Sequence, residues 1–333
     1  MFIIKRGLFH VNKFNLSQLY TFSTKNNNLG LIVETSQVNS IVTTPEYGSS
    51  IKVLDCTYTA GAKPDPEKFI KEEYGKFDLL MKKESAHHQM YLDAHLPKAI
   101  FFDLNCAMFP GDHERFSFYP SDKIEEYMQI LGINKGDHLI LYGRGIYGGN
   151  MFAARCLRLL QLYGMKNMSL MNGGLPKWVN DKYEISTGEE TPLKRGNWEA
   201  RPIENKMLIT YDELIAKDKE GKSLFDKAGE DVTFLDSRPH EQFIASFIEG
   251  SNNLPISKLL NENGTIASRK TILEVLKKYK VDVTKPIISY CNTGTQASLA
   301  SLIFESVLGI KTRLYNGSLS ELSDRSPERI TSF

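Results

Sequence analysis

The stretch that decides the fold is Pro286-Ile287-Ile288-Ser289-Tyr290, followed by Cys291-Asn292-Thr293-Gly294-Thr295-Gln296. A short, mainly apolar run of this kind is typical of a strand that is covered on both faces. Residues 297–308 are mostly apolar and end at Gly309, which predicts a helix that closes on a left-handed glycine. The sequence therefore predicts a strand, a polar loop and a helix in that order, with Cys291 at the end of the strand.

The same order of elements occurs twice along the chain. In each half the sequence predicts a short strand, an amphipathic helix, a buried strand, a helix after a glycine-containing turn, and a final strand. The corresponding pairs are residues 51–55 and 232–236, 124–131 and 272–279, 138–142 and 286–290, 151–162 and 297–308, and 168–171 and 312–315. Because strands and helices alternate, we expect an α/β fold in which each half has a mostly parallel sheet flanked by helices.

A chain of 333 residues exceeds the usual size of one hydrophobic core, so two domains are expected. Residues 188–201 separate the two halves, because this segment is rich in charge, contains Pro192 and Gly196, and has no hydrophobic period. We therefore predict an N-terminal domain over residues 29–187, a linker over 188–202 and a C-terminal domain over 203–333. Residues 1–28 are predicted to be a disordered extension or a presequence.

The N-terminal composition bears on where the protein is found. No acidic residue occurs from Met1 to Gly30, whereas four residues there are basic, namely Lys5, Arg6, Lys13 and Lys25. Acid-poor, basic and hydroxyl-rich segments are typical of organellar import peptides. The same composition suits a plain extension, so a mitochondrial and a cytoplasmic location are both expected alternatives. No run of about 18 apolar residues exists, and no membrane partner is expected.

Charge and cysteine usage exclude several classes of function. The 41 basic and 40 acidic residues leave no basic field that could hold a nucleic acid. The four cysteines form no C-x-x-C pair, and Cys56, Cys106 and Cys156 are predicted to be inert buried side chains. His87 and His88 lack partners at ligand spacing, so a solvated insertion is predicted there and no metal site. No cofactor is expected.

Cys291 has a different setting from the other cysteines. In doubly wound sheets, ligands bind at the carboxyl ends of strands, where turns enter helices. A loop of small and polar residues at that point can turn backbone N–H groups inward as an anion nest, and the helix dipole adds to the field. Both effects favour the thiolate, which is the nucleophilic form of cysteine. We therefore predict that Cys291 is a nucleophile and not a core residue.

Six segments of the chain carry a family resemblance. They are Leu54-Asp55, His95-Leu96-Pro97, residues 170–178, Leu235-Asp236-Ser237-Arg238, residues 291–297 and Tyr315-Asn316-Gly317-Ser318. In order and spacing they resemble the tandem-domain rhodanese family, which includes 3-mercaptopyruvate and thiosulfate sulfurtransferases. The resemblance implies two tandem rhodanese-like domains. Gly143 stands where the C-terminal domain has Cys291, so the N-terminal domain should be inactive and mainly shape the cleft.

The resemblance also implies a reaction in two steps. The Cys291 thiolate attacks the outer sulfur of a small donor, becomes a persulfide, and passes that sulfur to a thiol such as thioredoxin or glutathione, or to cyanide. The loop amides stabilise the negative charge that develops on the persulfide. The residues that carry these amides are Asn292, Gly294, Thr295, Gln296 and Ala297.

The choice of donor depends on the side chains around Cys291. Thiosulfate-preferring members of the family place cationic residues directly after the cysteine, whereas Asn292 and Thr293 stand here, so mercaptopyruvate is expected to be preferred. The hydroxyl of Thr293 could handle the proton as pyruvate leaves, or it could simply bond to the backbone. Arg238 matches the first substrate arginine of the family, although it could instead pair with Asp236 or Glu241.

The chain departs from the family pattern at other substrate positions. The second family arginine falls on Gln242, and two expected tryptophans fall on Leu319 and Leu322. His240 is a candidate for a further polar contact with the substrate. Two alternatives to a sulfurtransferase remain open at this point. One is a persulfide carrier or regulatory relic with an eroded substrate site. The other is a cysteine-dependent phosphatase, which lacks support because Ala297 stands where such enzymes have an arginine.

Overall fold

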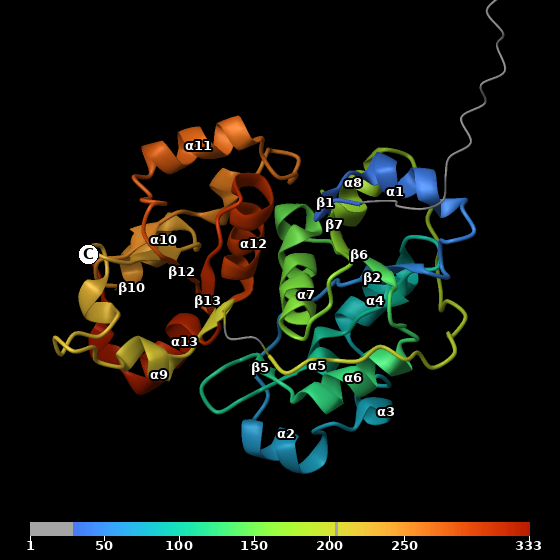
Figure 1. Ribbon diagram of the computed structural model, residues 1–333. Coiled ribbons are helices and arrows are strands. Elements are labelled where there is room, and N and C mark those ends of the chain that lie inside the picture. The colour runs from blue at the N-terminus through green and yellow to red at the C-terminus, as the bar shows by residue number, and fades with distance from the viewer. Residues whose placement is uncertain (1–28, 204–205) are drawn as a thin grey trace, which may run out of the picture.

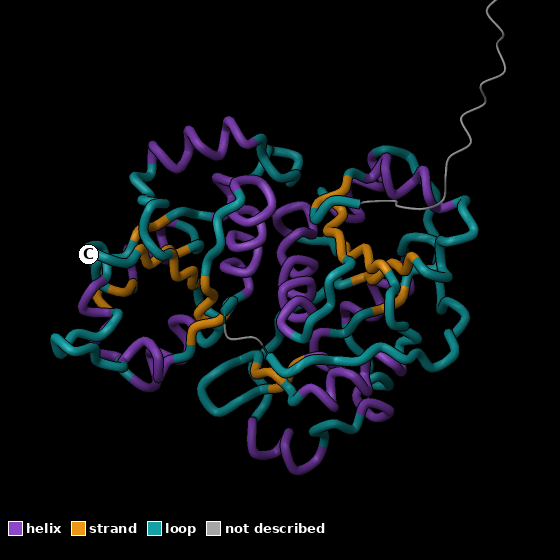
Figure 2. The backbone as a smooth tube through the Cα atoms, in the orientation of Figure 1, coloured by secondary structure: helices purple, strands orange, loops and turns teal. Residues whose placement is uncertain are grey.

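The computed structural model describes residues 29–203 and 206–333. The predicted extension or presequence over residues 1–28 lies outside the described residues. Figure 1 shows two halves, each built around its own sheet, with the helices α7 (Asn150–Leu162) and α12 (Thr295–Ile303) side by side between them. Figure 2 shows the strands of the two main sheets apart from each other, with helices around each of them. The predicted α/β fold with two parallel-sheet domains is confirmed.

Both main sheets have five parallel strands and the same pattern of connections. The N-terminal sheet has the order β1-β7-β6-β2-β3, with β1 at Ile32–Val33, β7 at Met168–Met171, β6 at His138–Tyr142, β2 at Ile51–Asp55 and β3 at Ile100–Phe101. The C-terminal sheet has the order β11-β9-β12-β13-β8, with β11 at Asn252–Asn253, β9 at Thr233–Asp236, β12 at Ile287–Tyr290, β13 at Arg313–Tyr315 and β8 at Leu208–Ile209. Asp55 pairs with Tyr142 in one sheet and Asp236 with Tyr290 in the other, so the two strand ends correspond.

The N-terminal sheet is covered on both faces because successive strand residues point to opposite sides. Leu54 packs into a core that includes α6 (Ser121–Ile130) and α7. Its neighbour Val53 packs on the other face, against α1 (Thr35–Val42), α4 (Ala86–Asp93) and α8 (Gly174–Asn180). The shorter helices α2 (Pro66–Glu72), α3 (Phe77–Leu80) and α5 (Leu104–Ala107) and the antiparallel pair β4 (Met108–Phe109) and β5 (Ser117–Phe118) complete this half.

The C-terminal sheet is covered in the same way. Leu235 faces the side of α11 (Arg269–Lys278) and α12, whereas Phe234 faces α9 (Tyr211–Ile215) and α13 (Ser318–Arg325). Helix α12 continues into a π-helical turn, Phe304–Leu308, and Gly309 follows with a φ of 75°. The predicted left-handed glycine at the end of this helix is confirmed. Helix α10 (His240–Ala245) and the antiparallel pair β10 (Phe247–Ile248) and β14 (Ile330–Thr331) lie at the outer side of this half.

The two halves share one continuous hydrophobic core across α7 and α12. Buried residues of α7, such as Leu157, and of α12, such as Leu302, belong to the same cluster. Arg158 of α7 forms an ion pair with Glu305, which follows α12. The predicted linker has little regular structure, but it packs firmly on the N-terminal half, since Trp198 is only 4% exposed.

The structure corrects one prediction and supports another among the polar and thiol side chains. His87 is not solvated, because it is 3% exposed and lies 3.2 Å from both Thr59 Oγ1 and Asp103 Oδ1. Cys56, Cys106 and Cys156 are buried, as predicted.

Within residues 29–203 and 206–333, no group of three or more His, Cys, Asp or Glu side chains could hold a metal ion. In that same part of the chain, no helix combines the length and apolarity required to cross a membrane.

Candidate active site

Cys291 lies where the predicted strand, loop and helix meet. It directly follows β12, and three residues separate it from the first residue of α12. Its N–H donates to Ser318 Oγ at 3.2 Å, and its carbonyl oxygen accepts from the N–H of Leu319 at 3.3 Å. The residue is 2% exposed, whereas the next residue, Asn292, is exposed. Cys291 therefore lies at the base of a loop that is open to solvent at Asn292.

The backbone of this loop has the character of an anion nest. Among the described residues, no acceptor contacts the amide N–H groups of residues 292–297. Gly294 has a φ of 77° and precedes the first residue of α12, so the loop turns directly into the helix. Ser298 closes the first turn, because its N–H and its Oγ both donate to Gly294 O, at 3.0 and 2.7 Å. Free amides at a helix N-terminus favour a negative charge on the sulfur of Cys291.

Gly294 is fixed by a close approach of a neighbouring turn. A Cβ atom at this position would lie 2.8 Å from Asn316 O, and the backbone is left-handed. The facing turn is also unusual, since Ser318 has a φ of 53° although it is not a glycine. Strained conformations of this kind persist where the surrounding structure holds them. Here the strain positions the Ser318 hydroxyl, which accepts from Cys291 N–H and donates to Tyr315 O at 2.8 Å.

The side chains of the loop make few contacts of their own. Thr293 Oγ1 lies 3.4 Å from Thr295 Oγ1. The hydroxyl of Thr293, two residues after Cys291 in the sequence, thus makes a contact within the loop. The amide of Gln296 donates to the hydroxyl of Tyr147 at 3.4 Å. Tyr147 belongs to the turn Ile146–Gly149 of the N-terminal half, which therefore reaches the edge of the loop. The predicted candidates Asn292, Thr293, Gly294, Thr295, Gln296 and Ala297 are thus brought together around Cys291.

Arg238, a predicted substrate residue, is bonded to other protein groups in the structure. It lies next to the site, because Ser237 N–H donates to Tyr290 O at 3.1 Å. Its guanidinium is bonded to the Asp236 carboxylate, with Nε at 3.0 Å from both oxygens and Nη2 at 2.6 Å from Oδ2. It also donates to the carbonyl and hydroxyl oxygens of Ser246. The pairing with Asp236, which the sequence left as an alternative, is the arrangement found.

Among the described residues, no hydrogen bond joins the side chain of His240 or Gln242 to Cys291. His240 is exposed at the start of α10 and lies 3.2 Å from Asn253 Oδ1, and Gln242 is exposed on the same helix. Leu319 and Leu322 are 3% and 0% exposed and belong to the core under α13. They pack in the core there, and the backbone N–H of Leu319 donates to Cys291 O, so Leu319 lies beside the candidate nucleophile. An eroded substrate site at these two positions stays a prediction.

Sequence reasoning missed a buried cation that the N-terminal half places behind the loop. Arg155 of α7 is 1% exposed, and its Nη1 donates to Ser298 Oγ at 3.4 Å. The same nitrogen would lie 3.2 Å from a Cβ at Gly294, and Nη2 donates to Asn316 Oδ1. In the sequence, Arg155 stands within the apolar helix segment 151–162, and nothing there signals a partner more than a hundred residues away.

The corresponding loop of the N-terminal half has no nucleophile and no room for one. Gly143 follows β6 as Cys291 follows β12, and a Cβ at Gly143 would lie 2.9 Å from Gly149 O. The strand-end carboxylate is again paired with an arginine, since Arg144 Nη2 lies 3.0 Å from Asp55 Oδ2. The two halves thus keep the same buried charge pair with arginines from different loops.

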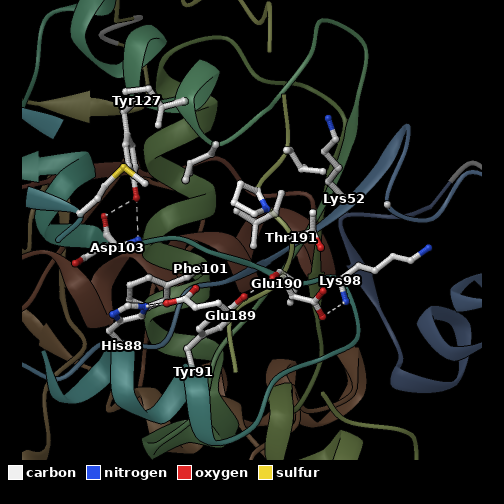
Figure 3. A pocket seen from close by; sticks show the side chains of 18 residues that line it. Lys52, His88, Tyr91, Lys98, Phe101, Asp103, Tyr127, Glu189, Glu190 and Thr191 are labelled. Atoms are coloured by element: carbon white, nitrogen blue, oxygen red, sulfur yellow. Dashed lines mark hydrogen bonds and ion pairs between the residues drawn. The ribbon is translucent and has the colours of Figure 1, made fainter. Parts of the chain in front are cut away.

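A cavity of about 560 Å³ lies in the N-terminal half, at the edge strand β3 (Figure 3). No cysteine or serine lines it. Most of its charged groups are paired with other protein groups: Lys52 with Asp137, His88 with Glu189, and Glu190 with His95 and the N–H of Lys98. The cavity therefore offers no cysteine or serine nucleophile, and of its charged side chains only Lys98, which lies 5.9 Å from the Tyr47 ring centroid, makes no ion pair among the described residues. The Cys291 loop therefore remains the candidate active site.

The chain is thus a two-domain α/β protein in which a doubly wound domain occurs twice and the candidate nucleophile Cys291 lies at a strand end. The family model described as a rhodanese-like domain matches residues 72–181 and 204–325. The Caenorhabditis elegans protein mpst-1, named as a thiosulfate sulfurtransferase, is 34% identical over 317 residues, which cover 90% of this chain and 96% of the relative. The 3-mercaptopyruvate sulfurtransferase of Escherichia coli K12 is 26% identical over 253 residues, or 72% of this chain and 83% of the relative.

The fold also matches solved structures. The crystal structure of the Tum1 protein from Saccharomyces cerevisiae superposes with a TM-score of 0.71 and 22% identity, and the match covers 91% of this chain and 98% of that protein. The chain therefore belongs to the rhodanese family and carries two tandem rhodanese-like domains. It is a sulfurtransferase. The predicted family and enzyme class are confirmed.

Proposed function

We propose that Cys291 is the sulfur carrier of this sulfurtransferase and that it works through a persulfide. The observation that carries the proposal is the loop itself, in which a cysteine at the end of β12 is followed by six amide N–H groups without an acceptor among the described residues. These amides and the N-terminus of α12 supply a field for an anionic sulfur without any cationic side chain in the loop.

In the first half-reaction the Cys291 thiolate attacks the sulfur of a small donor. With 3-mercaptopyruvate, a bond forms between the two sulfur atoms and the carbon–sulfur bond of the donor breaks. The electron pair stays on the carbon of the departing enolate, which takes up a proton and leaves as pyruvate. The hydroxyl of Thr293 is the candidate for handling that proton, because it lies in the loop two residues from Cys291.

In the second half-reaction an acceptor thiolate attacks the outer sulfur of the Cys291 persulfide. The new bond joins the acceptor to that sulfur, and Cys291 leaves as a thiolate, ready for another turn. Thioredoxin and glutathione are the acceptors proposed, since both present a free thiol. Gly143 and its crowded surroundings support the proposal that the N-terminal domain has no sulfur carrier of its own.

We propose mercaptopyruvate as the preferred donor over thiosulfate. The side chains directly after Cys291 are uncharged, so a sulfonate group would find no cation there. The guanidinium of Arg238 supplies no free fork either, because Asp236 and Ser246 occupy it. Recognition of the donor carboxylate is therefore assigned to the free loop amides and to the polar side chains at the rim, Thr293 and Gln296.

Intact-mass spectrometry tests this proposal directly. After incubation with mercaptopyruvate, the protein should gain the mass of one sulfur atom, and the gain should be smaller with thiosulfate at equal concentration. Cys291→Ser should show no gain, whereas Cys156→Ser, which changes a buried cysteine of α7, should keep it. Added glutathione should remove the extra mass. A wild-type protein that gains no sulfur from either donor would refute the persulfide mechanism.

A further inference from the structure

The loop around Cys291 is neutral in its side chains, but a buried cation from the other domain lies against it. Arg155 projects from α7 of the N-terminal domain, where it is 1% exposed. Both hydrogen-bond acceptors of its terminal nitrogens, Ser298 Oγ and Asn316 Oδ1, are neutral and belong to the C-terminal domain. Its Nε has no acceptor among the described residues. A guanidinium in such a setting keeps its charge at neutral pH but lacks a bound carboxylate.

The contacts of Arg155 place this charge behind the nucleophile. Ser298 lies in the first turn of α12 and donates to Gly294 O, and Asn316 follows β13, the strand next to β12. Nη1 also lies 3.2 Å from the position that a Cβ at Gly294 would take. On its other side the guanidinium lies over the rings of Phe116 and Phe118, at 5.7 and 5.8 Å. These rings and the loop fix its position from both sides.

The electrostatic coupling agrees with this geometry. Burial lowers the pKa of Arg155 to about 10, while negative charge on Glu114, on Cys291 and on Cys156 acts in the opposite direction. An attraction between two groups acts on both, so a cation that is held by a thiolate also favours that thiolate. Desolvation of the site strengthens the effect, because screening by water is reduced.

One carboxyl group competes for the same cation. Glu114 accepts from Asn316 Nδ2 at 2.9 Å and from Ser117 Oγ at 2.9 Å, so it approaches Arg155 through Asn316. Burial raises the pKa of Glu114 above its ordinary value, and hydrogen bonds from Asn316 and Ser117 act in the opposite direction. Glu321 is the other carboxylate that acts on Glu114, and it is paired with Arg325. The field at Cys291 is thus set by Arg155 on one side and by Glu114 on the other.

We propose that Arg155 is a positioning residue of the Cys291 site, which the N-terminal domain contributes to stabilise the anionic sulfur of Cys291 as thiolate and as persulfide. The persulfide part rests on the function proposed above, whereas the thiolate part does not. The N-terminal domain, which has Gly143 where the C-terminal domain has Cys291, would then supply the only side-chain cation that bonds to the first turn of α12 among the described residues.

A pH titration of the ultraviolet absorbance of the thiolate tests the proposal without any sulfur donor. The signal of Cys291 is obtained as the difference between each protein and the same protein with Cys291→Ser. In Arg155→Met, which keeps an apolar stem but removes the charge, the midpoint of the titration should rise by about one pH unit. Arg155→Lys keeps the charge and should recover part of that shift. Glu114→Gln removes the competing carboxylate and should move the midpoint in the opposite direction.

Arg158→Met is the matched control. Arg158 lies one helical turn further along α7, is 6% exposed, and also reaches the C-terminal domain, but it bonds to Glu305 and not to the Cys291 loop. Its loss should weaken the interface and leave the midpoint unchanged. A midpoint that is equal in wild type and Arg155→Met, or that shifts equally in Arg158→Met, would overturn the proposal. If Arg155→Met does not fold, equal midpoints in wild type, Arg155→Lys and Glu114→Gln would overturn it.

The second readout is the rate of persulfide formation. At neutral pH it should fall about tenfold in Arg155→Met, in line with the smaller thiolate fraction, and change less than twofold in Arg158→Met. A wild-type protein that forms no persulfide would refute the proposed function, yet the titration would still decide the role of Arg155. An unshifted titration in a protein that does form the persulfide would refute the role of Arg155 alone.

Discussion

At the scale of single residues, the site depends on a few positions where the backbone leaves no freedom. Gly294 combines a left-handed φ with a Cβ position only 2.8 Å from Asn316 O, whereas Gly309, at the end of the same helix and its π-helical turn, has a similar φ and open space around it. Substitutions at the two glycines can therefore separate two contributions to the free energy of unfolding. One is the strain of the left-handed backbone, and the other is the close contact with Asn316.

Gly309→Ala should lower the free energy of unfolding by about 1 kcal/mol, because only the left-handed strain is added. Gly294→Ala should cost about 2–3 kcal/mol, since the loop must also move away from Asn316. Urea unfolding measures both. Gly294→Ala should in addition lose most of the persulfide signal while Gly309→Ala keeps it. Equal losses of stability in the two variants would show that the contact with Asn316 contributes nothing.

Arg238 offers a second test at this scale, because the structure assigns its guanidinium to Asp236. Asp236 is fully buried, so Arg238→Met would leave a carboxylate without its partner and should cost about 3–5 kcal/mol of stability. The double variant Asp236→Asn/Arg238→Met removes both charges and should recover more than half of that loss. Urea unfolding of the three proteins checks this.

The opposite outcome has a clear signature as well. A variant Arg238→Met that is as stable as wild type, with a raised KM for mercaptopyruvate and an unchanged KM for the thiol acceptor, would return Arg238 to the substrate-binding role that the family resemblance implied. The side chain would then have to leave both Asp236 and Ser246 when the donor binds.

At the scale of elements, the sequence predicts the strands that occur in both halves, but it does not reveal the short strands at the edges of the sheets. The strands β2, β6, β7, β9, β12 and β13 are found within one residue, because each is a buried apolar run with a clear end. The edge strands β1, β3, β8 and β11 have two residues each and therefore no period that a sequence could reveal. They are strands because a neighbouring strand pairs with them, and that neighbour lies far away in the sequence.

The same reasoning explains which parts of the site could be predicted. The loop from Cys291 to Ala297 is contiguous, so its order of strand, amides and helix can be read directly from the residues. The partners of that loop come from elsewhere: Ser318 is the first residue of α13, Tyr147 lies in the turn before α7, and Arg155 lies in α7 itself. For Arg238 the sequence offered pairing with Asp236 as an alternative to substrate contact, but the contact with Ser246 is seen only in the fold.

At the scale of the whole molecule, the repeat in the sequence suggests two independent domains, but the structure joins them. The core around α7 and α12 is continuous, and polar contacts tie further segments across the boundary. Asn172 Oδ1 accepts from Ile266 N–H at 2.9 Å, and Asn150 Nδ2 donates to Gly264 O at 2.7 Å. The backbones of Gly148 and Gly264 meet so closely that neither could carry a side chain. Such an interface should make the two halves unfold together.

Leu322→Ala tests this coupling with a probe that the chain already contains. Leu322 is fully buried under α13 of the C-terminal domain, so the substitution should cost about 2–5 kcal/mol. The two tryptophans of the chain, Trp178 and Trp198, both lie in or on the N-terminal half, and their fluorescence therefore reports that half. If the halves are coupled, the urea midpoint of the tryptophan signal should fall in Leu322→Ala and should coincide with the midpoint from circular dichroism.

Leu273→Ala, at a position 45% exposed in the same domain, should change either midpoint little. In Leu322→Ala, the tryptophan midpoint could stay at the wild-type value while circular dichroism shows a transition at lower urea concentration. That result would mean that the two domains unfold independently. Helix α7 with Arg155 would then stay folded after the loop around Cys291 has unfolded.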